Sequence, residues 1–532
     1  MTSMERAVEH DAVSIAAADH FNISYLYPYQ RLVITNILEA GGYYGSARTG
    51  QSRQIALLPT GSGKSLCYML PGILLGGVHV LVFPLLSLME DQRRRLKEAG
   101  CRVHVLRGGQ KREERTRIFS ALREGGTHFL ITNPEMLSIP EVRRQLRQLP
   151  VNHLVIDEAH TVSEWGDTFR PSLAALAGVI AELDSPLVTA CTATASSRIL
   201  RRLQETLFSG MPAHVIRANP DRPNIRYRVI PSLSPMRDLF DLTGDRGIRR
   251  PAVIFCPTRN DARHTAEMLA LRHQDCRIRY YHAGLSREEK LEQENWFLSS
   301  HDGILCSTIA FGLGIDKGDI RTVIHTQVPE TIEAYLQETG RAGRDRADAL
   351  AIMLVGASDL LKGTSVLVPA LLTHTLCRRE ALLALMDARP ETCSGCDVCA
   401  GDVWGFAAGE AVIRDAVGSH PYRHDLSAWA QFFCGVSEAP FGSFALWRYR
   451  SYGMLSSWLP EEAAEAIRSL VRLSALTCPS RGPWKGKLRS GMSASKAAIS
   501  LKTWRRLHPN WEAGIHSVPL PEQESRTYCR DV

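Results

Sequence analysis

Short, largely apolar runs recur along the chain, and longer stretches of mixed polar and apolar residues separate them. In the first part of the chain the runs occupy residues 55–58, 78–83, 103–106, 129–132, 154–157 and 187–190. Such runs are typical of strands buried on both faces, and the intervening stretches are long enough for helices. The alternation predicts an α/β domain with a parallel, doubly wound sheet.

A second series of apolar runs predicts a second α/β lobe. Its strands are expected at residues 252–256, 279–282, 303–307, 322–326 and 351–355. Between the two series, residues 209–236 contain Pro212, Pro220, Pro223, Pro231 and Pro235. Because proline fixes φ and removes a backbone donor, we expect this segment to hold no regular element and to form the seam between the lobes.

Residues 66–89 carry no formal charge, and their length alone suggests a membrane span. However, Pro71, Gly72, Gly76, Gly77 and Pro84 interrupt this stretch. We therefore predict a helix, a turn and a buried strand here, and no contact with a membrane.

Length and charge narrow the class of protein. A chain of 532 residues exceeds one hydrophobic core, so we expect about three or four domains. The net charge of +7 permits nucleic-acid binding, and residues 479–511 contain eight Lys or Arg without Asp or Glu, either as a DNA contact or as a solvated arm. The 13 cysteines form no disulfide framework and residues 1–20 lack a signal peptide, so we expect a cytoplasmic protein, nucleoid-associated if bacterial.

A glycine-rich loop follows the first apolar run. The candidate nucleotide-binding residues in it are Thr60, Gly61, Ser62, Gly63, Lys64 and Ser65. The glycines let backbone N–H groups face a phosphate, Lys64 can reach the β and γ oxygens of a nucleoside triphosphate, and the Ser65 hydroxyl can ligate Mg²⁺. The alternative is a plain turn between a strand and a helix.

Two carboxylates, Asp157 and Glu158, follow the buried run at 154–156. This places them at the carboxyl edge of the predicted sheet, beside the phosphate loop. Asp157 is suited to holding Mg²⁺, and Glu158 to deprotonating the water that attacks the γ-phosphate. The alternative is an acidic turn on the surface.

The second lobe contains Arg341 and Arg344 within residues 337–344. Their spacing of three would present both to one face if the segment is helical. Guanidinium groups that reach the γ-phosphate when two lobes close act as arginine fingers. The alternative is a surface cluster paired with Glu338 and Asp345.

Four cysteines, Cys377, Cys393, Cys396 and Cys399, have the spacing of a metal site. Tetrahedral Zn²⁺ favours thiolates at such spacings, and four protein ligands leave no open position, so the site would be structural. Buried cysteines without a metal are the alternative.

These motifs, in this order, resemble superfamily 2 DEAH-box helicases, and among them the RecQ family of DNA helicases, over residues 25–476. The similar segments are residues 27–30, 84–92, 133–135, 192–195, 221–224, 282–285 and 310–317. The resemblance places Gln30 at the adenine and adds Gly314 and Asp316 to the nucleotide site. It also implies that Trp165, Phe169 and Arg170, in an aromatic loop, contact single-stranded DNA, although a core tryptophan is the alternative.

The resemblance implies two RecA-like parallel-sheet motor lobes, then a zinc-binding helical element and a degraded winged-helix domain. The expected boundaries are 1–22 for an N-terminal extension, 23–208 and 209–357 for the lobes, 358–402 for the zinc element, 403–478 for the winged helix and 479–532 for a basic tail. The implied activity is ATP-dependent unwinding of duplex DNA with 3′ to 5′ translocation on single-stranded DNA. The rivals are an RNA helicase and a DNA-binding scaffold that does not unwind. Protein partners are not indicated.

Overall fold

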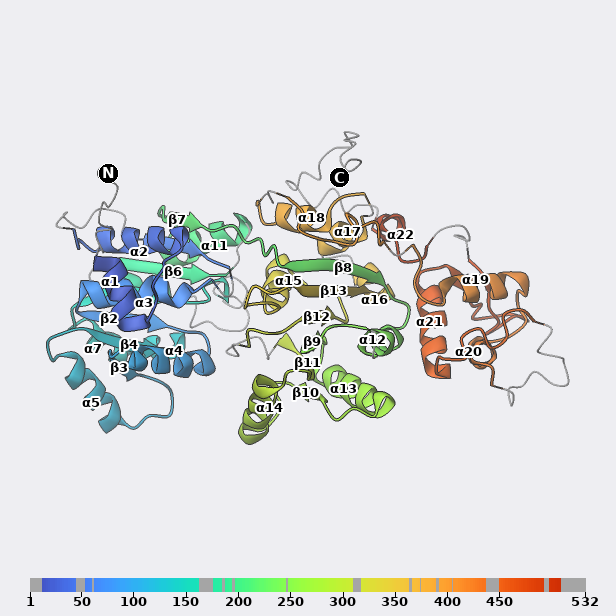
Figure 1. Ribbon diagram of the computed structural model, residues 1–532, viewed down its shortest axis with the longest axis horizontal. Helices are drawn as coiled ribbons and strands as arrows, with labels where there is room; N and C mark the ends of the chain where they lie inside the picture. The colour runs from blue at the N-terminus through green and yellow to red at the C-terminus, as the bar shows by residue number, and fades with distance from the viewer. Residues whose placement is uncertain are drawn as a thin grey trace, which may run out of the picture. The chain divides into compact units, whose positions relative to one another are not determined.

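The computed structural model describes residues 12–44, 53–59, 62–161, 176–183, 187–193, 197–244, 247–309, 317–362, 366–373, 375–388, 392–403, 405–436, 449–491 and 497–508. The chain divides into two compact units, Met1–Asp221 and Arg222–Val532. Each unit is built on a parallel sheet of its own (Figure 1). Two parallel-sheet lobes were expected, and this part of the predicted fold class is confirmed.

The first unit contains a seven-stranded sheet in the order β3-β4-β2-β5-β6-β1-β7, and all of its strand pairs are parallel. The strands are β1 (Arg53–Leu57), β2 (Val78–Val82), β3 (Arg102–Val105), β4 (His128–Thr132), β5 (Val151–Ile156), β6 (Leu187–Thr192) and β7 (His214–Arg217). The first six coincide with the predicted apolar runs. Parallel order directs the carboxyl ends of β1 and β5 to the same edge of the sheet.

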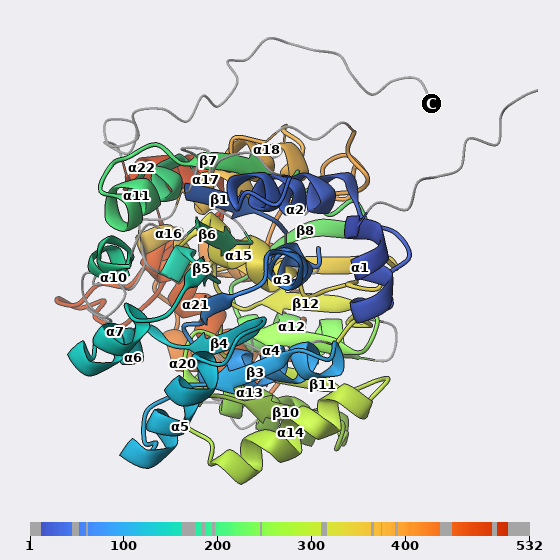
Figure 2. The same ribbon diagram turned by 90° about the vertical axis from the view of Figure 1, so that its left-hand side faces the viewer.

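Helices cover both faces of this sheet. They are α1 (Ala12–Phe21), α2 (Pro28–Ala40), α3 (Lys64–Leu75), α4 (Leu86–Glu98), α5 (Arg112–Leu122), α6 (Pro134–Leu137), α7 (Pro140–Leu146), α10 (Leu176–Glu182) and α11 (Ser197–Phe208). Side chains of α2, α3 and α4 pack with one set of strand residues, and those of α5, α7, α10 and α11 pack with the alternating set. Figure 2 shows the sheet between these helices. The uncharged stretch at residues 66–89 forms most of α3, all of β2 and the start of α4.

The second unit contains a six-stranded parallel sheet in the order β10-β11-β9-β12-β13-β8. The strands are β8 (Ile225–Pro231), β9 (Ala252–Phe255), β10 (Ile278–Tyr281), β11 (Ile304–Ser307), β12 (Thr322–His325) and β13 (Ala349–Val355). Helices α12 (Pro235–Thr243) and α13 (Arg259–His273) share one apolar cluster with the sheet. Helices α14 (Arg287–Ser299), α15 (Ile332–Thr339) and α16 (Ala357–Lys362) accompany the second lobe.

The C-terminal region packs into the same apolar cluster as the other face of the second sheet. It contains α17 (Leu367–Leu372), α18 (Arg378–Ala384), α19 (Glu410–Ser419), α20 (Leu426–Cys434), α21 (Pro460–Arg472) and α22 (Leu501–Leu507), with a small antiparallel pair, β14 (Leu476–Thr477) and β15 (Arg489–Ser490). Part of the expected basic tail is therefore folded: Trp504 of α22 is 2% exposed, and Arg506 donates a hydrogen bond to the Leu473 carbonyl.

The prediction that residues 209–236 hold no regular element is wrong. Strand β7 pairs with β1, and β8 pairs with β13. Both strands lie at sheet edges, where a proline costs little because one side of the strand needs no ladder partner. Pro231 is the last residue of β8, and Pro235 occupies the first turn of α12, where a missing N–H is tolerated.

No helix within the described ranges is both long and apolar enough to cross a membrane.

Candidate functional site

The phosphate-loop segment joins β1 to α3 in the first unit. Thr60 and Gly61 lie outside the described residues, while Ser62 and Gly63 lead directly into the helix that begins at Lys64. Gly63 has a φ of +77°, a left-handed conformation that residues with a Cβ rarely adopt. The loop thus reverses direction on a glycine and presents Lys64 and Ser65 in the first turn of α3.

Gln30 holds this loop from the preceding helix, α2. Its Nε2 donates a 2.8 Å hydrogen bond to the Ser62 carbonyl, and its Oε1 accepts one of 3.0 Å from the Tyr27 N–H. The Tyr29 hydroxyl donates a second bond, of 3.1 Å, to the same carbonyl. A Cβ on Gly63 would lie only 2.6 Å from Gln30 Nε2. The structure therefore assigns Gln30 a contact with the loop, and its expected contact with adenine stays a prediction.

Asp157 and Glu158, called the acidic pair, follow β5 at the same edge of the sheet. Lys64 Nζ donates a hydrogen bond of 2.8 Å to Oε1 of Glu158, and both side chains are largely buried. Asp157 accepts hydrogen bonds from the Tyr68 hydroxyl at 3.0 Å and from the Glu158 N–H at 2.8 Å. Glu158 has a φ of +48°, an uncommon conformation for a residue other than glycine. Such strain is frequent at functional sites.

Burial and charge oppose each other in this group. Burial lowers the pKa of the Lys64 ammonium, but the Glu158 and Asp157 carboxylates outweigh it and hold that pKa above its usual value. Burial raises the pKa of Asp157, and Glu158 adds to the rise while Lys64 opposes it. The Lys64 ammonium is therefore the counter-charge for two carboxylates, those of Asp157 and Glu158. This excess of negative charge favours the binding of a further cation.

A contact links the acidic pair to β6. His160 Nδ1 lies 3.4 Å from Glu158 Oε2 and forms a hydrogen bond of 2.9 Å with the Thr192 hydroxyl. Thr192 begins residues 192–195, one of the segments that resemble the helicase motifs, of which residues 194 and 195 lie outside the described part. The sequence motifs did not indicate that His160 contacts both Glu158 and Thr192.

Arg341 and Arg344 follow α15 in the second unit. The expected helical face is wrong, because α15 ends at Thr339 and both arginines lie in a turn in which Gly343 has a φ of +54°. Arg341 is buried and Arg344 is half-buried. The two carboxylates named above as alternative partners contact other residues: Glu338 forms a hydrogen bond of 2.8 Å with His325, and Asp345 accepts one from Arg321.

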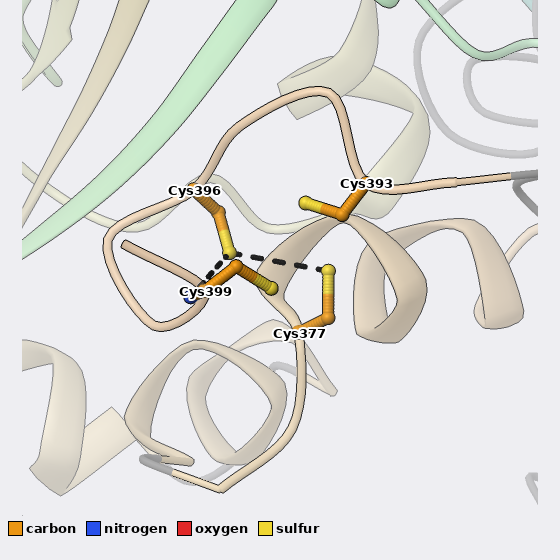
Figure 3. A group of neighbouring side chains, drawn as sticks. All are labelled: Cys377, Cys393, Cys396 and Cys399. Carbon is orange, nitrogen blue, oxygen red and sulfur yellow. Dashed lines mark hydrogen bonds between the residues drawn. The ribbon is translucent and has the colours of Figure 1, made fainter. Parts of the chain in front are cut away.

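The four predicted cysteines lie together in the second unit. Their sulfur atoms are all within 4.8 Å of one another and point inward, as Figure 3 shows. The sulfur atoms of Cys377 and Cys396 are 3.9 Å apart. A tetrahedral site with metal–sulfur bonds of about 2.3 Å requires separations of about 3.8 Å, so the donor set fits such a metal. The hydrogen bond between the Cys377 and Cys396 sulfur atoms and the one from the Cys399 N–H lower the pKa of Cys396 to about 4.

A buried ion pair fixes the cysteine cluster to the second sheet. Arg378 and Asp397 are each next to a cluster cysteine, and Arg378 Nε lies 2.9 Å from Asp397 Oδ1, with both side chains 1% exposed. Asp397 also accepts a 3.0 Å hydrogen bond from the Val229 N–H of β8, and Tyr227 pairs with Cys396 in a short parallel bridge. Sequence reasoning missed this support, because isolated charged residues usually indicate a surface.

Seven predicted site residues lie outside the described residues. They are Thr60 and Gly61 of the phosphate loop, Trp165, Phe169 and Arg170 of the aromatic loop, and Gly314 and Asp316 of the second lobe. Their expected contacts with DNA and nucleotide stay predictions.

An exposed aromatic surface occurs in the segment between β14 and β15. Trp484 is 52% exposed and stacks on Tyr422, with ring centroids 5.1 Å apart. The Arg489 guanidinium lies over Tyr422, and the same segment contains Arg481, Lys485 and Lys487. Trp429, Trp458 and Trp504 are instead buried. Among the described C-terminal tryptophans, Trp484 therefore offers a face on which a base can stack.

Comparison with known families matches both units. The family model for the DEAD/DEAH box helicase matches residues 27–203, and the model for the helicase conserved C-terminal domain matches residues 234–346. Together the two matches cover more than half of the chain. The first match includes the phosphate loop and the acidic pair. The second includes the turn at residues 340–344 that contains Arg341 and Arg344, called the arginine turn below.

Curated relatives extend this match. The chain is 38% identical over 311 residues to the "Probable ATP-dependent DNA helicase RecS" of Bacillus subtilis, which covers 57% of this chain and 61% of that protein. It is 31% identical over 394 residues to the "ATP-dependent DNA helicase RecQ" of Pasteurella multocida, covering 68% and 62%. The chain thus spans a little under two thirds of the length of these relatives.

Solved structures share the fold. The DUF1998 helicase MrfA bound to DNA has a TM-score of 0.53 at 18% identity, over 92% of this chain and 64% of that chain. The DEAD-box helicase Mss116 bound to single-stranded RNA and UDP-BeF has a TM-score of 0.53 at 17% identity, over 66% of this chain and 74% of that chain.

On the family models and the curated relatives, the chain belongs to the DEAD/DEAH box helicases with a helicase conserved C-terminal domain, and the expected resemblance to the RecQ family is confirmed.

Proposed function

We propose that this protein is an ATP-dependent DNA helicase that translocates 3′ to 5′ on single-stranded DNA and unwinds duplex DNA. The observation that carries the proposal is the 2.8 Å contact between Lys64 of the phosphate loop and Glu158 of the acidic pair. The contact brings a phosphate-binding cation and a general base to one point at the edge of the first sheet. A scaffold that does not hydrolyse ATP has no use for this arrangement.

Each residue of this group has a proposed role. Lys64 binds the β- and γ-phosphates, and Glu158 accepts the proton of the attacking water. Ser65 and Asp157 would hold Mg²⁺, which neutralises phosphate charge when bound. Arg341 and Arg344 would stabilise the charge that develops on the γ-phosphoryl oxygens.

We further propose that Cys377, Cys393, Cys396 and Cys399 bind one structural Zn²⁺. The inward-pointing sulfur atoms support this assignment, and four thiolates at these separations suit zinc better than harder metals. The surface around Tyr422 and Trp484 would contact duplex DNA, since it combines an exposed ring with several basic residues. A cytoplasmic location, nucleoid-associated in a bacterium, fits this activity.

Hydrolysis with different nucleic acids tests the proposal. ATP turnover is measured alone, with single-stranded DNA and with RNA of the same sequence, for the native chain and for Lys64→Ala. The proposal requires that DNA stimulate ATP turnover more than RNA does, and that Lys64→Ala abolish this turnover. Lys97→Ala, which removes an exposed lysine of α4, is the control and should keep it. Equal or greater stimulation by RNA would favour the RNA helicase.

A further inference from the structure

The arginine turn of the second unit is held from outside by Arg222. The Arg222 guanidinium donates hydrogen bonds to three backbone carbonyls of the turn, those of Gly340 at 3.0 Å, Ala342 at 3.2 Å and Gly343 at 2.8 Å. The carbonyls of Gly340 and Ala342 flank Arg341, and that of Gly343 directly precedes Arg344. A planar fork of donors suits such a set, because a guanidinium can reach several acceptors at once.

Asn224 holds the same turn from a second direction. Its Nδ2 donates hydrogen bonds of 2.8 Å to the Gly343 carbonyl and 2.9 Å to the Ala347 carbonyl. The Gly343 N–H in turn donates to the Ile320 carbonyl at 2.8 Å. A Cβ on Gly343 would lie 2.5 Å from Asn224 Nδ2 and 2.5 Å from the Ala347 oxygen, so the turn fits tightly against its support.

Arg379 connects this support to the cysteine cluster. Arg379 lies two residues after Cys377, its side chain is fully buried, and its Nη1 donates a 3.1 Å hydrogen bond to the carbonyl of Arg222. Its Nη2 donates to the Ile225 carbonyl, and its guanidinium lies 5.2 Å from the centre of the Tyr227 ring. Arg222 is thus held at its backbone by Arg379 while its side chain holds the turn.

We propose that Arg222 is a positioning residue for Arg341 and Arg344, and that Arg379 fixes Arg222 in place. The inference rests on the proposed function, in which the two turn arginines stabilise transition-state charge. Arg222 binds carbonyls and not the reacting groups, so its loss should leave ATP binding intact while the turn arginines lose their alignment. A displacement of about 1 Å in such a group lowers turnover by about 100-fold.

A purely structural role for Arg222 predicts a different pattern. It would lower the melting temperature and reduce turnover only in proportion to the folded protein lost. Arg237 provides the matched control, because it is a buried arginine of the same unit whose guanidinium contacts Asp241 and the Ser457 carbonyl. Arg237→Ala should therefore destabilise the unit without moving the turn.

The test compares Arg222→Ala, Arg222→Lys, Asn224→Ala and Arg237→Ala in the full chain. It measures kcat and KM for ATP with saturating single-stranded DNA, the melting temperature, and amide hydrogen exchange of residues 337–347. We expect Arg222→Ala to lower kcat by about 10- to 100-fold with KM changed less than about threefold, and to accelerate exchange in the turn. Arg222→Lys, which keeps one donor group, should recover part of kcat, and Asn224→Ala should show a smaller loss.

Two results would overturn the proposal: faster exchange in the turn of Arg222→Ala with an unchanged kcat, or a loss of kcat in Arg237→Ala as large as that in Arg222→Ala at the same loss of melting temperature. Lys64→Ala is measured in parallel. If Lys64→Ala keeps its turnover, the proposed function itself fails. If Lys64→Ala is inactive and Arg222→Ala has normal turnover, only the positioning role fails.

Discussion

The Lys64 ammonium and the Glu158 carboxylate, 94 residues apart in the chain, form a hydrogen-bonded ion pair with 2.8 Å between Nζ and Oε1. A phosphate that binds Lys64 must compete with this carboxylate. In the proposed function, nucleotide binding and the release of Glu158 to act as a base are therefore linked at one contact. On this proposal the base stays paired with Lys64 until a phosphate binds.

Glu158→Gln should separate ATP binding from hydrolysis. The amide cannot accept the water proton, so single-turnover hydrolysis should fall by at least about 100-fold. ATP should bind as tightly as before or a few-fold more tightly, because the neutral amide competes less for Lys64. Hydrolysis by rapid quench and equilibrium binding of a fluorescent ATP analogue measure both effects. Glu98→Gln, an exposed change on α4, serves as the control, and near-normal turnover by Glu158→Gln contradicts the assignment.

Trp165→Ala and Phe169→Ala should weaken the response to DNA more than basal hydrolysis. Stacking of one base on an aromatic side chain is worth about 1 to 3 kcal/mol, so the DNA concentration for half-maximal stimulation should rise by about 5- to 150-fold. Titration of ATP turnover with single-stranded DNA measures this shift. If both variants lose the same fraction of turnover with and without DNA and also melt at lower temperature, these residues belong to the core.

The cysteine cluster should contain one Zn²⁺ per chain. Elemental analysis of protein purified without chelator gives the stoichiometry. Cys396→Ser should lower it to near zero and unfold the element locally, because metal binding supplies folding free energy. Cys276→Ser, at an exposed cysteine outside the cluster, should keep the metal. Native protein without stoichiometric zinc rules out the site.

Asp238→Asn should stabilise the second unit at alkaline pH. Burial raises the pKa of Asp238 from 3.8 to about 7. Between those values the unfolded chain has released a proton that the folded chain retains, so the free energy of unfolding decreases as the pH rises through this window. The neutral amide removes this cost and still accepts a hydrogen bond from Ser232.

The gain in unfolding free energy for Asp238→Asn should therefore be small at pH 4 and grow to about 2 to 4 kcal/mol at pH 8. Urea unfolding at several pH values measures it, with Asp415→Asn, at an exposed position of α19, as the control. A gain that does not depend on pH would show that Asp238 is ionised in the folded protein.

The sequence predicted the parts of the fold that depend on local pattern. Apolar runs located the inner strands of both sheets, and motif spacing identified the cysteines that meet in space. Lys64, Asp157 and Glu158 were expected together, because parallel strands end at one edge of a sheet.

Features that depend on distant contacts were not predictable. Strand β8 lies in a segment rich in proline, and only its pairing with β13 defines it. Arg378 is buried with Asp397 as its hydrogen-bond partner, and Arg379 is buried with the carbonyls of Arg222 and Ile225 as its partners. No local sequence pattern indicates these distant contacts. The turn after Thr339 accepts hydrogen bonds from Arg222, which lies more than 100 residues earlier in the chain.

Strand displacement is the most direct test of the central claim. Duplexes with a 3′ or a 5′ single-stranded tail, in DNA and in RNA, are incubated with the protein and Mg²⁺, with ATP or a non-hydrolysable analogue, and with Lys64→Ala in parallel. We predict displacement of the DNA duplex with a 3′ tail, only with ATP and only by protein that retains Lys64. Displacement without hydrolysis, displacement of the RNA duplex alone, or ATP turnover without displacement of any duplex would contradict an ATP-dependent DNA helicase.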